Sequence, residues 1–146
     1  MKKILIFFIL ALSISITGCS NSSDYLTGKT FNLAYPPDPT SNQDILENHE
    51  IFMTLSFKNG TVTREDGNEI QGEYTLNDDI LTIEFEKEKE TLNVEFGELT
   101  ESEKDFVVFV TDVSNVTLDG DSSEIKYLSE VGNKLNEGLP IEFIEE

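Results

Sequence analysis

The chain has 146 residues, one cysteine and a formal net charge of −19, from 29 acidic against 10 basic side chains. Phosphate binding requires clustered Lys and Arg, so this balance argues against a nucleic-acid partner. A single cysteine excludes an internal disulfide and any site built from several thiolates. The core of one domain of this length must therefore be held by packing alone.

The first nineteen residues have the layout of a secretory signal. Lys2 and Lys3 precede an apolar run over residues 4–16, and Ile16-Thr17-Gly18-Cys19 closes it with small residues before a cysteine. The apolar run is shorter than the roughly 20 residues that a membrane-spanning helix requires. These features favour a cleaved leader over a retained transmembrane helix.

The motif at residues 16–19 resembles the lipobox of bacterial lipoproteins. This resemblance implies that residues 1–18 are removed and that Cys19 is diacylated on its sulfur. Two acyl chains give lasting membrane anchorage, whereas one binds only marginally. We therefore expect residues 19–24 to form a short tether and residues 25–146 to form one domain at the extracytoplasmic face of the cell membrane.

Loss of the leader makes the domain more acidic. It leaves 8 basic and 29 acidic side chains, a net charge of −21. Anionic lipid would repel such a domain, so the lipid anchor must hold it at the membrane. A cationic partner would be steered toward it.

Alternating apolar and polar residues dominate the remaining chain and predict β-strands. Asn59-Gly60, Asp66-Gly67 and Asp78-Asp79 predict turns, because these residues tolerate positive φ. Gly72 stands in the inward row of its strand and indicates a bend. We expect eight or nine short antiparallel strands, over residues 29–34, 51–57, 61–63, 70–76, 81–86, 92–96, 106–110, 115–118 and 141–144.

The spacing of apolar residues changes in the C-terminal third of the chain. The unbroken apolar run 106–110 predicts a strand covered on both sides, paired with 115–118 across a turn at 112–114. Residues 124–136 then show helical spacing after a serine N-cap at position 122 or 123. Gly138 and Pro140 would end this helix.

Together these elements predict a mainly β fold, an antiparallel meander closing into a small barrel, with one C-terminal α-helix. Closure removes the exposed sheet edges, and the helix could plug one end or cover the outside. The segments 26–31, 55–62, 72–76 and 79–83 resemble small bacterial lipocalin-like lipoproteins, although the tryptophan usual near the start of that family is absent. The resemblance implies a lipocalin-like barrel; a two-sheet sandwich is the alternative.

Catalytic residues cannot be assigned. His49 is the only histidine and precedes a strand, where we expect an exposed loop residue; a general base or pH sensor is the alternative. No pair among the 29 carboxylates stands out as an acid and base. We therefore expect a protein that is not an enzyme and has no cofactor.

The segment that begins at Asp119 has oxygen-bearing side chains at the spacing of a calcium loop. Asp119, Asp121, Ser123 and Glu130 fall at the first, third, fifth and twelfth positions, where an EF-hand places oxygen ligands. Glu124 occupies the sixth position, where the sharp turn needs glycine. We therefore expect an acidic turn between strand and helix, and no metal site.

The long first connection is the preferred candidate for a binding loop. Its prolines stiffen it, and loops on a rigid scaffold often carry recognition; lipocalin-like folds use this connection as a lid. A plain surface crossover is the alternative. The candidate residues are Tyr35, Pro36, Pro37, Asp38 and Pro39.

Two functions fit these features. The first is an acidic protein-binding module on the membrane, with a cationic protein as partner. The alternative is a barrel that holds one small apolar or amphiphilic ligand. Seven large aromatic residues are expected to fill the interior and so favour the first, namely Phe31, Phe52, Phe57, Tyr74, Phe85, Phe96 and Phe109.

Overall fold

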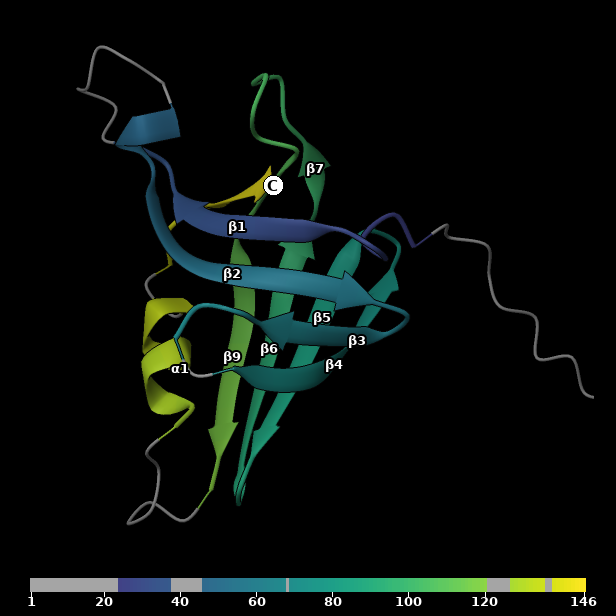
Figure 1. The fold of residues 1–146 in the computed structure, drawn as a ribbon, viewed down its shortest axis with the longest axis vertical. Coiled ribbons are helices and arrows are strands. Elements are labelled where there is room, and N and C mark those ends of the chain that lie inside the picture. Colours follow the sequence, from purple (N-terminus) through teal and green to yellow (C-terminus); the bar gives the residue numbers. More distant parts are fainter. Residues whose placement is uncertain (1–23, 38–45, 68, 121–126, 136–137) are drawn as a thin grey trace, which may run out of the picture.

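The computed structural model describes residues 24–37, 46–67, 69–120, 127–135 and 138–146. The predicted leader, Cys19 and most of the tether lie outside these residues. The described chain is mainly β, with a single α-helix (Figure 1). Its elements are β1 (Thr30–Tyr35), a 3₁₀ turn η1 (Leu46–Asn48), β2 (Glu50–Lys58), β3 (Thr61–Arg64), β4 (Ile70–Asn77), β5 (Ile80–Lys87), β6 (Glu90–Glu98), β7 (Thr100–Glu101), β8 (Phe109–Thr111), β9 (Val113–Asp119), α1 (Ser129–Leu135) and β10 (Ile141–Glu145).

All strands belong to one antiparallel sheet with the order β7-β8-β10-β1-β2-β3-β4-β5-β6-β9. Strands β1 to β6 follow one another as a meander, as the alternation and turns predict. In Figure 1, β1 to β4 cross in front of β5, β6 and β9, which run in nearly the perpendicular direction. The sheet is therefore strongly curled.

The two ends of this sheet are joined through continuous chain. Strand β7 follows β6 after one residue, and β8 leads into β9 across Asp112. Between the β6–β9 and β7–β8 ladders, the N–H of Gly97 donates to the carbonyl of Asp112 at 2.7 Å. The stretches 90–101 and 109–119 thus run side by side, and the fold is barrel-like.

The hairpin turns have the predicted chemistry. Asn59 and Gly60 have φ values of 49° and 81°, and Asp78 and Asp79 have φ values of 50° and 64°. Two consecutive positive φ angles match the twist of the flanking strands. These turns fix the register of β2 with β3 and of β4 with β5.

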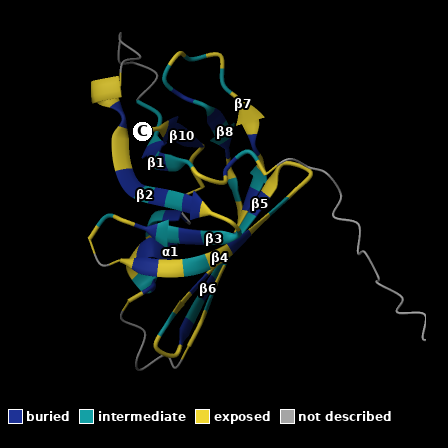
Figure 2. Cartoon of the chain, turned by 45° about the vertical axis from the view of Figure 1, so that its right-hand side comes forward, coloured by how far each residue is buried: buried dark blue, intermediate teal, exposed yellow. Residues whose placement is uncertain are grey.

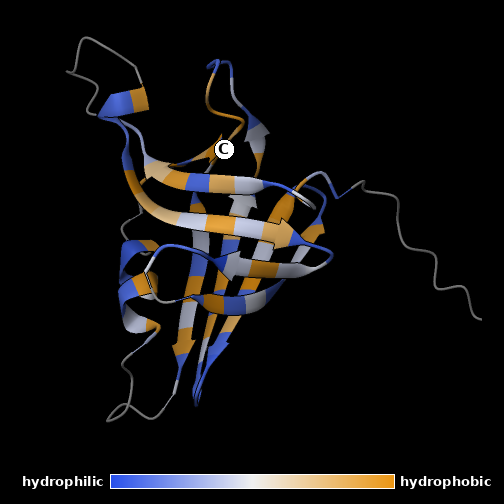
Figure 3. Ribbon diagram, in the orientation of Figure 1, coloured by the Kyte–Doolittle hydropathy of each residue, from blue (hydrophilic) through white to orange (hydrophobic). Residues whose placement is uncertain are grey.

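Side chains alternate between a buried inner row and an exposed outer row along the strands, as Figure 2 shows by burial and Figure 3 by hydropathy. The seven aromatic residues predicted to fill the interior are all buried in one contiguous core. Phe31 makes edge-on contacts with Phe57 and Phe143, at centroid distances of 6.0 and 5.8 Å. Such contacts add to the free energy gained by burying the rings.

Helix α1 packs onto this same core through Val131 and Leu135. Leu128, which immediately precedes the helix, packs there too. A Cβ at Gly132 would lie 3.3 Å from a methyl carbon of Leu92, so the helix lies close against β6. Of the two predicted placements, covering the outside is therefore wrong, because the helix packs against the inner side of the sheet.

The predicted helix is too long at its N-terminal side. Tyr127 precedes the helix, which begins at Ser129; residues 124–126 and the predicted serine cap lie outside the described residues. The buried carboxylate of Glu90 accepts the N–H of Tyr127 at 3.0 Å and of Leu128 at 2.8 Å. A strand carboxylate, remote in sequence, thus holds the chain entering the helix.

Two predictions for the stretch 106–118 are wrong. The strand begins at Phe109 rather than Phe106, and β8 pairs with β10 and β7, whereas β9 pairs with β6. Position 112 is an interruption between strands instead of a hairpin turn, because Val113 already belongs to β9. Alternation reveals which face a residue occupies but does not select the partner strand.

Candidate functional site

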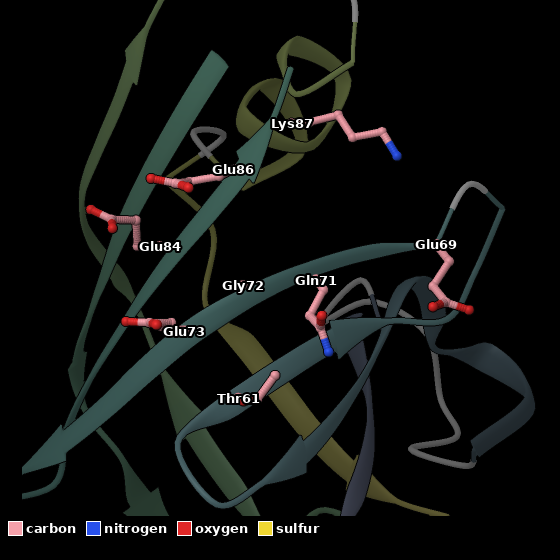
Figure 4. Close-up of a pocket in the computed structure, with 8 residues that line it drawn as sticks. All are labelled: Thr61, Glu69, Gln71, Gly72, Glu73, Glu84, Glu86 and Lys87. Carbon is pink, nitrogen blue, oxygen red and sulfur yellow. The ribbon is translucent and has the colours of Figure 1, made fainter. Parts of the chain in front are cut away.

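An acid-lined groove of about 590 Å³ lies on the outer face of β3, β4 and β5 (Figure 4). Its carboxylates come from Glu69 and Glu73 on one side and from Glu84 and Glu86 on β5. All four residues are exposed. Glu73, Glu84 and Glu86 occupy the outer row of β4 and β5, whose inner row is mostly buried, and Glu69 directly precedes β4. Lys87 is the one basic residue among those that line it.

These four glutamates form no ion pair within the part of the chain that the structure describes. Glu73 and Glu84 are opposite each other in the β4–β5 ladder. Like charges directly opposite across a ladder are destabilising. The groove therefore concentrates negative charge, and a bound cation would reduce the repulsion between its carboxylates.

Tyr35, the first residue of the predicted binding loop, is built into the fold. Its half-buried ring stacks on Phe52 at 4.5 Å, and its hydroxyl donates to the carbonyl of Lys134 in α1. Pro36 and Pro37 are also half-buried, whereas Asp38 and Pro39 lie outside the described residues. Tyr35 thus anchors the start of this connection to the helix.

The prediction that His49 is an exposed loop residue is wrong. His49 is 7 % exposed, and its Nε2 lies 2.7 Å from Oε2 of Glu142. The angles of this contact do not suit a hydrogen bond, so the attraction is ionic when the ring is protonated. Lys104 contacts the other oxygen of Glu142 at 2.6 Å, and Phe106 packs edge-on against the imidazole at 5.1 Å.

This cluster fastens the loop between β7 and β8 over the outer face of β10. Val107 from that loop is buried against Ala34 and Ile144 in a second, smaller core. Lys104 joins the same loop to Glu142. The side chains of His49 and Glu142 are enclosed by protein, so we assign the cluster a role in holding the fold.

A second polar cluster fixes the chain where it enters the domain. The Asp24 carboxylate accepts the hydroxyls of Thr27 and Tyr74, each at 2.6 Å, and the N–H of Leu26 at 3.1 Å. Partial burial alone would raise the pKa of Asp24, but these hydrogen bonds outweigh it and lower the pKa. Partial burial and the bond to Asp24 raise the pKa of Tyr74.

The described residues contain no group of three or more His, Cys, Asp or Glu side chains arranged to hold a metal ion. Of the calcium-loop candidates, Asp119 and Glu130 are described, whereas Asp121 and Ser123 lie outside. No helix in the described ranges is long and apolar enough to cross a bilayer.

Comparisons with protein-family models, curated proteins and solved structures find no match.

The groove glutamates do not stand out among the 29 acidic residues of the sequence, although a signal for two of them exists. The two-residue turn at Asp78-Asp79 sets the register of the hairpin, and counting outward from it places Glu73 opposite Glu84. Both residues also belong to the polar row of their strands. Combining turn and alternation would therefore have revealed the facing carboxylates.

Proposed function

We propose that this chain is a membrane-anchored extracytoplasmic lipoprotein, with a lipocalin-like barrel that binds a cationic protein and performs no catalysis. The groove with four glutamates and a single lysine is the observation that carries the binding role. The lipobox resemblance at residues 16–19 supports the anchor, with the lipid on Cys19. An acidic surface at the membrane would attract basic proteins by long-range steering.

The packed interior supports a protein partner over a small apolar ligand. Large aromatic side chains such as Phe57, Phe85 and Phe96 occupy the centre of the core and are about 1 % exposed. The hollows of about 700 and 720 Å³ beside the β7–β8 loop are open to solvent. Recognition by the outer surface therefore fits this fold better than enclosure of a ligand.

The binding role is tested with the chain anchored in vesicles of neutral lipid, so that the lipid adds no charge. A small, strongly basic protein and an acidic protein of similar size serve as probe and control. We expect the basic protein alone to bind, and its affinity to fall steeply as ionic strength rises from about 0.1 M to about 1 M, which shortens the screening length from about 10 to about 3 Å. Equal retention of both proteins, or affinity independent of salt, would contradict the proposal.

A further inference from the structure

One of the two hollows beside the β7–β8 loop lies where the chain enters the domain. Its volume is about 700 Å³, and Tyr25 lines it together with residues of β6, β7 and β8 and of the β4–β5 turn. The Tyr25 hydroxyl donates to the carboxylate of Asp79 at 3.0 Å, and the N–H of Leu99 donates to the carbonyl of Asp79 at 2.8 Å. Hydrogen bonds therefore fix three parts of its wall to one another. We call it the Tyr25 hollow.

The floor of the Tyr25 hollow is apolar. Leu99, Val107 and Phe109 line it and are only 5 %, 3 % and 7 % exposed. The half-buried ring of Tyr25 packs on Phe109 with a centroid distance of 4.9 Å. An alkyl chain that entered the hollow would replace water against these side chains, which is favourable.

The rim of the Tyr25 hollow carries an excess of negative charge. The exposed carboxylates of Asp79, Glu98 and Glu101 line it. Glu98 and Glu101 form no ion pair with any residue that the structure describes. Lys29 is the one basic residue that lines the hollow, and its ammonium group already pairs with Glu145 at 2.9 Å.

This charge acts at the aromatic pair. Glu101 lies opposite Phe109 in the β7–β8 ladder, and side chains directly opposite each other share one face of a sheet. Partial burial, the hydrogen bond to Asp79 and the negative charges of Asp79, Asp24 and Glu101 raise the pKa of the Tyr25 hydroxyl. The potential that disfavours a tyrosinate here would favour a cation, which the face of an aromatic ring also attracts.

We propose that the Tyr25 hollow binds a cation carried on an apolar stem, with the stem on the apolar floor and the charge beside Asp79 and Glu101. The ligand is an alkylammonium or alkylguanidinium group. Two sources supply it: a free alkylamine, or a Lys or Arg side chain of the cationic partner, whose stem buries while its charged end stays at the surface. No residue of the hollow lines the acid-lined groove, so the site goes beyond the proposed function and does not depend on it.

The first test compares small ligands on the wild-type chain, at full length and ¹⁵N-labelled, in micelles of a neutral detergent. Butylammonium is the probe, butanol lacks its charge, and methylammonium lacks its stem. We expect butylammonium to bind about fivefold more tightly than either control, because both stem and charge contribute. The amide signals of Leu99, Glu101 and Phe109 should shift as it binds.

The second test removes charge from the rim. The hollow variant combines Asp79→Asn with Glu101→Gln. The matched control combines Asp78→Asn with Glu103→Gln, which removes the same charge from exposed neighbours that do not line the hollow. Asparagine tolerates the positive φ of both turn positions. We expect the hollow variant to bind butylammonium about fivefold more weakly than the control, and both to bind butanol equally.

Equal binding of butylammonium and butanol to the wild-type chain, or of butylammonium to the two variants, overturns the site. If the hollow variant does not fold, the wild-type series decides: tighter binding of butylammonium with shifts at Leu99, Glu101 and Phe109 supports the site, and shifts confined to other residues overturn it.

Competition with the basic probe protein separates the two sources of the cation. Displacement of that protein by butylammonium, but not by the same concentration of sodium, assigns the hollow to a side chain of the partner. Binding of butylammonium beside the bound protein assigns it to a free amine. A chain that binds butylammonium but no basic protein keeps the hollow and overturns the proposed function.

Discussion

Replacing Glu142 by glutamine should destabilise the protein strongly, because it removes one partner of a buried charge cluster. Both side chains of the His49–Glu142 contact are nearly inaccessible, at 0 % and 4 % exposed. Removing one partner of such a pair costs about 3–5 kcal/mol. Glutamine keeps the shape and some hydrogen bonding, so we expect about 3 kcal/mol. With a urea dependence of about 1.5 kcal/mol per molar, the unfolding midpoint should fall by roughly 2 M.

The same strand offers a matched control. Glu145 pairs with Lys29 at 2.9 Å, but these side chains are 39 % and 36 % exposed. Replacing Glu145 by glutamine should cost below about 1 kcal/mol, as for other solvated ion pairs. Both variants are compared by urea unfolding, followed by far-ultraviolet circular dichroism, in a chain that carries Cys19→Ser.

Similar midpoints for the two variants would refute this reasoning. In that case the His49–Glu142–Lys104 cluster would not be what holds the β7–β8 loop against β10. Hydrogen exchange gives an independent reading, because opening of this loop should expose the amide of Val108, which donates to the carbonyl of Phe143 at 2.8 Å.

Three further predictions concern separate parts of the fold. Gly72→Ala should lower the free energy of unfolding by about 2–3 kcal/mol in urea titration, because the added methyl meets backbone; an unchanged midpoint would contradict the close contact. Asp24 has a lowered pKa in the folded chain, so its contribution to stability is present above its unfolded pKa of about 3.9 and is lost as pH falls through the lower folded value. Asp24→Asn should therefore reduce the difference between urea midpoints at neutral and acidic pH, whereas an identical pH dependence in both proteins would count against the cluster. Glu90→Gln should speed hydrogen exchange at Leu128 and cost about 1–2 kcal/mol; unchanged exchange would show that the carboxylate does not hold the helix entrance.

Local chemistry explains which parts of the fold the sequence could predict. The turns at Asn59-Gly60 and Asp78-Asp79 need positive φ angles, which few residue types adopt, so their positions are set by single residues. Burial was predictable as well, because side chains of a strand alternate between its two faces whatever strand lies beside it. The seven aromatic core residues were therefore predictable.

Contacts between distant segments were not predictable in this way. Whether β8 pairs with β9 or β10 depends on the path of the whole sheet, which no local pattern encodes. The burial of His49 likewise depends on Glu142, 93 positions later, and on Lys104. The sequence Ile141-Glu142-Phe143-Ile144 does indicate that Glu142 has a partner, because a charge inside an apolar strand needs one.

The acid-lined groove was predictable only in part, because it depends on local patterns and on contacts between distant segments. Outer-row glutamates and the inward Gly72 are visible in the sequence, but the end of the β4–β5 ladder at Gly72 and Phe85 is not. For the predicted loop, Tyr35 proved to be bound to the helix, whereas the role of Asp38 and Pro39 stays a prediction.

We propose that a lipid on Cys19 holds the acidic surface outside the cell, and mass spectrometry of the chain purified from its own cells tests for that lipid. We expect a mature protein that begins at Cys19 with a diacylglyceryl group on the sulfur, and a Cys19→Ala chain that keeps its leader and lacks lipid. An intact leader with an unmodified thiol at Cys19 in the wild-type chain would contradict the proposed lipid anchor.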